Sequence, residues 1–143
     1  MKIVIAGDHA AFDVKSDVVN FLETKGISVI DLGTNSYDSV DYPVYGQMVA
    51  KHLLAGHSQR GIIICGTGIG ISIAANRFKN IRATLCSTVH DAEMARKHND
   101  SNVLALGART TNIEKIKNII YVWLSTDFEG GRHQDRLELI DGI

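Results

Sequence analysis

Short apolar runs alternate along this chain with segments of helical periodicity. The first run, residues 2–6, is rich in β-branched residues, and it is followed by apolar positions at Val14, Val18, Phe21 and Leu22 that fall on one face of a helix. The same alternation continues through the chain. It predicts strands at residues 2–6, 27–32, 61–64, 81–86 and 101–106, helices at about 10–25, 43–55, 71–80, 88–98 and 112–125, and a short helix in the tail.

A strand–helix unit repeated in this way predicts a three-layer α/β fold with a parallel sheet. We expect one domain over residues 1–143, built on a five-stranded, doubly wound, Rossmann-like sheet in the order 2-1-3-4-5, followed by the tail helix. In that order the chain reverses its direction of winding between the first and third strands. Ligands of such sheets bind outside the carboxyl ends of the strands at this switch point.

Residues 61–72 read as a strand, a glycine-rich turn and the start of a helix. Three glycines, Gly66, Gly68 and Gly70, follow Cys65 directly. Backbone N–H groups at such a turn favour anionic oxygens, and the same environment stabilises a cysteine thiolate. The turn is therefore a candidate anion site with a reactive thiol beside it. The alternative is a tight packing turn in which Cys65 is a small buried hydrophobic residue.

The turn after the first strand carries Asp8 and His9, and the predicted sheet brings it beside the Cys65 turn. A carboxylate, an imidazole, a thiol and an anion site would then share one crevice. Asp8 is also a good helix N-cap, so a purely structural role is open for it.

The glycine spacing does not fit the common nucleotide-binding motifs. Ile71 stands where a dinucleotide-binding fingerprint has its third glycine, and the turn lies in the third strand–helix unit instead of the first. No Gly-Lys-Ser/Thr follows, so the turn is not a P-loop.

Basic residues near the C-terminus form a candidate phosphate site. Arg132 and Arg136 lie four residues apart, on one face of the tail helix, after Gly130 and Gly131, which permit a close approach of the backbone to a ligand. Arg109 follows the fifth strand, on the carboxyl side of the sheet. A solvated helix face is the alternative for the first pair.

The fourth helix ends at His98 and Asn99. Both residues suit a helix C-terminus, Asn99 as a left-handed cap and His98 as a cation favoured by the helix dipole. The predicted topology places them far from Cys65 in one subunit, so they would reach it only from a neighbouring subunit.

Composition excludes several classes of function. The net charge of −1 gives no electrostatic footprint for nucleic acid or for an anionic membrane, and no apolar run approaches the roughly 20 residues of a membrane span. The two cysteines make no disulfide framework, and a cytoplasmic location is expected. No two of the six histidines lie three or four residues apart beside a carboxylate, so we expect no metal site.

The chain resembles the type B ribose-5-phosphate isomerases, in the superfamily shared with galactose-6-phosphate isomerase, over essentially its whole length. The resemblance rests on ordered sequence blocks at residues 7–9, 40–43, 64–70, 96–100, 102–109 and 128–134. Those enzymes interconvert ribose 5-phosphate and ribulose 5-phosphate through a cis-enediolate, without a metal or organic cofactor.

The resemblance implies roles for individual residues. Cys65 would move a proton between carbons 2 and 1, His98 would open the furanose ring, and Thr67 and Asp8 would assist ring opening or bind a hydroxyl. The remaining positions would bind substrate: Gly66, Gly68, Ile69 and Gly70 at the enediolate, Tyr42 and Asn99 at the sugar, and His9, Arg109, Arg132 and Arg136 at the phosphate. The family also implies a homodimer, possibly paired into a tetramer, in which the site is shared and His98 comes from the second subunit.

Alternatives stay open at this point. The same chemistry could act on allose or galactose 6-phosphate, and a non-catalytic sugar-phosphate sensor could use the same fold. A sensor needs no base, however, and the chain keeps Cys65, Thr67 and His98 together. Some family members use a carboxylate on the following helix as the base, but residues 71–76 contain none. A thiol-redox protein would favour Cys-x-x-Cys, whereas Cys65 and Cys86 are 21 residues apart.

Overall fold

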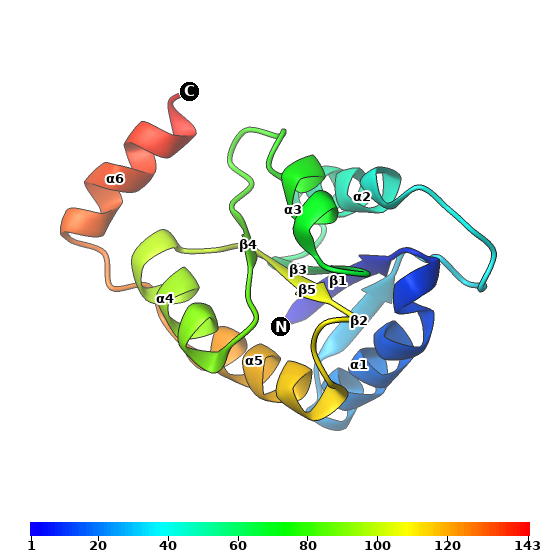
Figure 1. Ribbon diagram of the computed structural model, residues 1–143. Coiled ribbons are helices and arrows are strands. Elements are labelled where there is room, and N and C mark those ends of the chain that lie inside the picture. Colours follow the sequence, from blue (N-terminus) through cyan, green and yellow to red (C-terminus); the bar gives the residue numbers. More distant parts are fainter.

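The computed structural model describes residues 1–143 as a five-stranded, wholly parallel sheet with helices on both faces (Figure 1). The strands are β1 (Lys2–Gly7), β2 (Ser28–Asp31), β3 (Arg60–Cys65), β4 (Ala83–Leu85) and β5 (Val103–Gly107). The helices are a 3-10 turn, η1 (His9–Ala11), and α1 (Phe12–Thr24), α2 (Tyr42–Leu54), α3 (Ile69–Ala75), α4 (Val89–Asn99), α5 (Ile113–Ser125) and α6 (Arg132–Asp141). The predicted α/β class and the predicted succession of elements are confirmed.

Each face of the sheet has its own hydrophobic core. Alternate residues of β1 supply both, since Ile3 and Ile5 belong to the core under α1, α4 and α5, whereas Val4 and Ala6 belong to the core under α2 and α3. The first core is centred on the fully buried Trp123. Figure 1 shows α1 and α5 on one side of the sheet and α2 and α3 on the other.

The predicted strand order was wrong at one edge, because the sheet runs β2-β1-β3-β5-β4. β5 pairs with β3 from Gly61↔Val103 to Cys65↔Gly107, and β4 occupies the edge. Every residue of β5 is buried, as a central parallel strand requires, whereas the three residues of β4 are only partly covered. The fully apolar strand therefore takes the inner position. The switch point between β1 and β3 is where the sequence predicted it.

α3 ends at Ala75, earlier than the predicted residue 80. The reason is local, since the Asn76 side chain forms 2.8 Å hydrogen bonds with both the N–H and the carbonyl of Ala83 and ties the end of the helix to the start of β4. Asn80 adopts a left-handed conformation (φ 67°), which helical backbone cannot accommodate.

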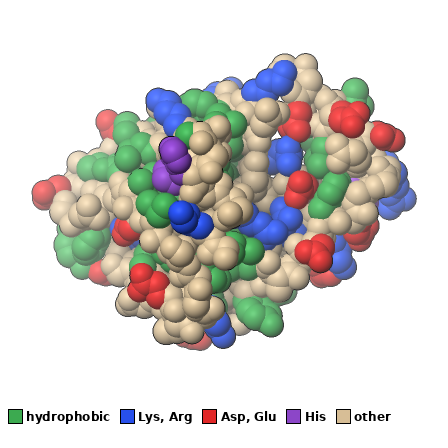
Figure 2. All heavy atoms as spheres, turned by 180° about the vertical axis from the view of Figure 1, so that it is seen from behind, with side chains coloured by type: hydrophobic (Ala, Val, Ile, Leu, Met, Phe, Trp, Pro, Cys, Tyr) green, Lys and Arg blue, Asp and Glu red, His purple; other side chains and the backbone are tan.

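The tail helix α6 projects away from the sheet (Figure 1). It buries Leu137, but Leu139 and Ile140 remain 76% and 49% exposed. On the face drawn in Figure 2, cationic and anionic side chains are interspersed, in keeping with the net charge of −1. None of the helices has the length and hydrophobicity needed to cross a bilayer.

Candidate active site

A crevice of about 510 Å³ opens at the carboxyl ends of β1 and β3. Predicted site residues make up most of its lining: Asp8, Tyr42, Cys65, Gly66, Thr67, Ile69, Gly70 and Arg109. Ile73 also lines it and was not predicted. Its position on α3, one helical turn after Ile69, was the signal in the sequence.

The Cys65 thiol lies at the inner end of this crevice. It is the last residue of β3, is 4% exposed, and its Sγ accepts a hydrogen bond from the Gly68 N–H at 3.1 Å. Gly68 can turn its N–H inward because it is left-handed (φ 79°), and a Cβ there would lie 2.8 Å from the backbone of Leu106. A hydrogen bond donated to sulfur is stronger when the sulfur is a thiolate. The turn therefore places a backbone donor directly against the Cys65 sulfur.

Thr67 lies at the exposed tip of the turn, where its Oγ1 accepts a hydrogen bond from the Ile69 N–H at 3.2 Å. The N–H groups of Gly68 and Ile69 are thus engaged by side chains of the turn itself. The predicted anion site at this turn therefore has fewer free backbone N–H donors than its glycine content suggested.

Asp8 has a structural role and also faces the crevice. Its Oδ1 accepts from the Ala10 N–H at 3.1 Å, as an N-cap does, and its own N–H donates to the carbonyl of Ile64 at 3.1 Å. The second bond fixes the 6% exposed Asp8 beside the end of β3. His9 does not line the crevice, and its Nδ1 accepts from the Val40 N–H at 3.1 Å.

Arg109 reaches the crevice because β5, not β4, lies beside β3. The backbone N–H of Ala108 donates to Cys65 at 2.8 Å and that of Arg109 to Gly66 at 2.9 Å. The exposed Arg109 guanidinium forms no ion pair within the chain. Its positive charge is therefore available to an anionic ligand.

Tyr42 closes the opposite side of the crevice. Its ring packs on Gly70, where a Cβ would lie 2.5 Å from ring atoms, so the turn must be glycine at that point. Tyr42 is the first residue of α2, and Pro43 follows it in the first turn, as the sequence predicted.

The other predicted site residues lie outside the crevice, near the junction of α4 and α6. The His98 ring stacks on that of His133 with centroids 4.3 Å apart. Arg132 and Arg136, in the first turns of α6, are exposed and form no ion pair within the chain. His133 was not predicted as a site residue. The sequence feature that could have pointed to it is the four-residue spacing between His133 and Leu137, which places both on the buried face of α6.

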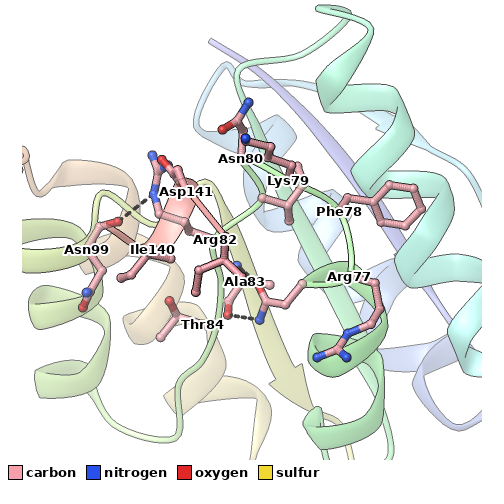
Figure 3. A pocket seen from close by; sticks show the side chains of 13 residues that line it. Arg77, Phe78, Lys79, Asn80, Arg82, Ala83, Thr84, Asn99, Ile140 and Asp141 are labelled. Atoms are coloured by element: carbon pink, nitrogen blue, oxygen red, sulfur yellow. Dashed lines mark hydrogen bonds and ion pairs between the residues drawn. The ribbon is translucent and has the colours of Figure 1, made fainter. Parts of the chain in front are cut away.

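A second cavity, of about 620 Å³, lies between α6 and the segment that joins α3 to β4 (Figure 3). Asn99 lines it, and Arg82 crosses it with ion pairs to Asp141 at 2.8 Å and Asp100 at 3.3 Å. No thiol or imidazole lines this cavity, and one carboxylate there is already paired. We therefore place the chemistry in the smaller crevice.

The fold and the crevice together define an α/β protein in which a buried thiol and an unpaired guanidinium share one crevice at the carboxyl ends of the strands. Residues 3–140 match the family model described as Ribose/Galactose Isomerase. Ribose-5-phosphate isomerase B of Escherichia coli is 48% identical over 142 residues, which cover 99% of this chain and 95% of that protein.

Solved structures agree with this match. The ribose 5-phosphate isomerase of Thermotoga maritima superimposes with a TM-score of 0.98 at 48% identity, covering 99% of this chain and 98% of that one. Ribose-5-phosphate isomerase B of Mycoplasma genitalium, solved with bound ribulose 5-phosphate, superimposes with a TM-score of 0.94 at 38% identity. The match covers 99% of this chain and 94% of that one. The chain belongs to the ribose/galactose isomerase family and is a sugar-phosphate isomerase of the aldose–ketose class.

Proposed function

We propose that this protein interconverts D-ribose 5-phosphate and D-ribulose 5-phosphate, with Cys65 as the base that acts on carbon. The observation that carries the proposal is a crevice in which a buried thiol, held by the Gly68 N–H, lies beside the unpaired guanidinium of Arg109. The E. coli relative is named for this reaction, and the M. genitalium relative holds ribulose 5-phosphate.

The proposed reaction begins with the open-chain aldose. The Cys65 thiolate removes the proton from carbon 2, and the electron pair of that bond forms the carbon 1–carbon 2 double bond while the aldehyde oxygen gains negative charge. The thiol then returns its proton to carbon 1, and the hydroxyl proton of oxygen 2 passes to oxygen 1. The product is the ketose, with no net gain or loss of atoms or electrons.

Polar groups of the glycine turn would stabilise the enediolate. Thr67 and its neighbours Gly66 and Gly70 line the same crevice as Cys65. Donors fixed in this way act where charge develops in the transition state. His98 would move the proton that opens the furanose ring, and Asp8 would hold a sugar hydroxyl.

The phosphate would supply binding energy away from the reacting carbons. Arg109, Arg132 and Arg136 are exposed guanidinium groups without partners in the chain, and such groups bind phosphate through paired N–H donors. His9 would complete the phosphate site. Binding at this end positions carbons 1 and 2 at the thiol.

A complete site requires a second subunit, because His98, Asn99 and the α6 arginines do not line the crevice that holds Cys65. The rim of that crevice supports a homodimer. Ile69, Ile73 and Leu85 are 53%, 54% and 38% exposed, and such apolar residues around a polar crevice suit an isologous interface. The partner would contribute its own His98 and Asn99, and dimers could pair further into a tetramer.

The deciding experiment is isomerisation of ribose 5-phosphate, assayed in parallel with allose 6-phosphate and galactose 6-phosphate in the presence of a chelator. We expect rapid formation of ribulose 5-phosphate and weak turnover of both hexose phosphates. Dominant turnover of a hexose phosphate would overturn the substrate assignment, and no turnover of the three would overturn the function. The assay needs a reductant, because both cysteines are free thiols and the proposed cytoplasmic location is reducing.

A further inference from the structure

Three side chains with metal-binding atoms converge where α6 begins. His98 ends α4, Glu129 lies in the link before α6, and His133 lies in its first turn; one donor atom from each lies within 4.8 Å of the others. The backbone explains the convergence. The Glu129 N–H donates to the carbonyl of Lys97 at 3.1 Å and so joins the link to the last turn of α4.

His133 is the most enclosed of the three. Its side chain is buried, and Nε2 has no hydrogen-bond partner, which is costly for a buried polar atom. Oε2 of Glu129 lies 3.4 Å from this nitrogen. Ligand atoms of a tetrahedral zinc site, with bonds of about 2.0–2.1 Å, lie about 3.3 Å apart. The pair therefore already has the spacing of two metal ligands.

The third ligand needs a rotation. The rings of His98 and His133 are stacked, with only 14° between their planes, and parallel stacked rings cannot both point a nitrogen at one ion. His98 is half-buried and its side chain makes no hydrogen bond, so rotation of its ring gives up only the stacking contact with His133 and breaks no hydrogen bond. Glu129 is exposed and can follow, while the buried His133 provides the fixed point.

We propose that His98, Glu129 and His133 form an exchangeable binding site for a divalent transition-metal ion, with Zn²⁺ as the best fit. Two imidazoles and one carboxylate suit Zn²⁺ or Co²⁺, whereas Mg²⁺ and Ca²⁺ require oxygen ligands. Three protein ligands leave one position open to water. The sequence did not reveal this site because His98 and His133 are 35 residues apart and their contact depends on where α6 lies.

The site has a consequence that rests on the proposed function. His98 is the residue assigned to ring opening, and an ion bound to its imidazole removes the lone pair that this step uses. Occupancy of the site therefore inhibits the isomerase, and a chelator restores it.

Binding is tested first without reference to activity. Zn²⁺ calorimetry and Co²⁺ visible absorption are measured on the Cys65→Ala protein, because the thiol is a competing metal ligand. We expect one ion per chain and tetrahedral Co²⁺ bands, and Glu129→Gln in the same background weakens binding at least tenfold. The matched control is His57→Gln. His52 and His57 form a second imidazole pair, with ring centroids 5.2 Å apart, but no third metal-binding side chain lies close enough to complete a site there. Absence of binding, or equal weakening by the control, overturns the proposal.

Inhibition is tested on the protein with Cys65 intact. Glu129 takes no part in the proposed isomerisation, so Glu129→Gln retains the basal rate and requires at least tenfold more Zn²⁺ for half-inhibition. Equal inhibition of both proteins assigns the effect to another residue and overturns the regulatory consequence. Metal binding by a protein that fails to isomerise ribose 5-phosphate retains the metal site and overturns the proposed function, so the two failures are distinguishable.

Discussion

The two groups of proposed active-site residues differ in what holds them in place. The crevice group lies on strand ends, where backbone hydrogen bonds join Asp8 to Ile64 at 3.1 Å and Ala108 to Cys65 at 2.8 Å. The group around His98 lies on helix ends, where the guanidinium groups of Arg132 and Arg136 form no ion pair and the His98 side chain makes no hydrogen bond. The sheet thus preorganises the half that we propose to transfer the proton. The other half is held loosely, and we expect it to be completed by a ligand and a second subunit.

The largest effect is expected at the thiol. Cys65→Ala removes the group that we propose as the base acting on carbon, so kcat should fall by about 10²–10⁴-fold, as for loss of a general base. Affinity for a phosphate-bearing substrate analogue should change little, because the proposed phosphate site is formed by the arginines and not by the thiol. The measurement is steady-state kinetics together with calorimetry. Turnover retained in Cys65→Ala would require a different base.

Cys86 provides the matched control for this variant, since it also follows a strand at the carboxyl edge of the sheet. It is 1% exposed in the core under α4, and burial, with a smaller contribution from Asp91, raises the pKa of its thiol to about 12. This thiol stays protonated at the pH of any assay. Cys86→Ala should therefore leave kcat within about twofold and cost stability by about 1 kcal/mol, and iodoacetamide should label Cys65 alone.

Mixing two inactive variants tests whether the two groups meet across subunits. Cys65→Ala and His98→Asn, co-expressed with different tags, should form heterodimers in which one of the two sites contains both intact residues. A random mixture should recover about one quarter of the wild-type activity, because half the dimers are mixed and each has one working site. Activity of the purified mixed dimer no higher than that of either parent would show that both residues serve the same subunit.

The sequence predicts features that depend on neighbouring residues better than features that depend on contacts between distant parts of the chain, and the two groups differ in this respect. β-branched runs and helical spacing are local, and they placed the strand ends that carry Asp8 and Cys65. The strand order depends on long-range pairing between two similar strands. Only a weak signal in the sequence indicated this order. β5 is an uninterrupted apolar run, as an inner strand requires, whereas β4 contains the polar Thr84.

The surroundings of His98 could not be predicted in the same way. His98 meets His133 only because the link at Glu129 is bonded to Lys97, and no periodicity in the chain encodes that contact. The position of Arg109 in the crevice likewise follows from β5 lying beside β3. Arg109 was a candidate from its place after the fifth strand, and the role of His98 came from the family resemblance, but the neighbours of both residues became known only from the fold.

A smaller effect is expected at the arginines of α6. Arg132→Ala or Arg136→Ala removes charge-assisted hydrogen bonds worth about 1.5–3 kcal/mol each, so KM for ribose 5-phosphate should rise about 10–100-fold with a lesser change in kcat. Arg77→Ala is the control, because Arg77 is an exposed arginine that lines the larger cavity. An equal rise in KM for the control would move the substrate to that cavity.

The smallest effect concerns how the helix beside each group begins. The N-cap residue of α3, at the crevice, is Gly68, which has no side chain to cap the helix, whereas α4, which carries His98, begins with a capping box between Thr88 and Asp91. Backbone N–H groups, with that of Ser87 first, hold the pKa of Asp91 below its ordinary value. The charged cap therefore contributes at neutral pH, and its contribution is lost only as the pH falls below the ordinary value of 3.8.

Thr88→Ala should accordingly lower the free energy of unfolding by about 1 kcal/mol at pH 7, measured by urea denaturation, with kcat unchanged and with recovery in Thr88→Ser. The cap fixes the start of α4, whereas His98 lies at its opposite end, so the effect is one of stability alone. A fall in kcat at a temperature where the variant is fully folded would mean that the position of His98 depends on the whole helix. The group around His98 would then depend on an intact α4 for its position, just as the crevice residues depend on the sheet.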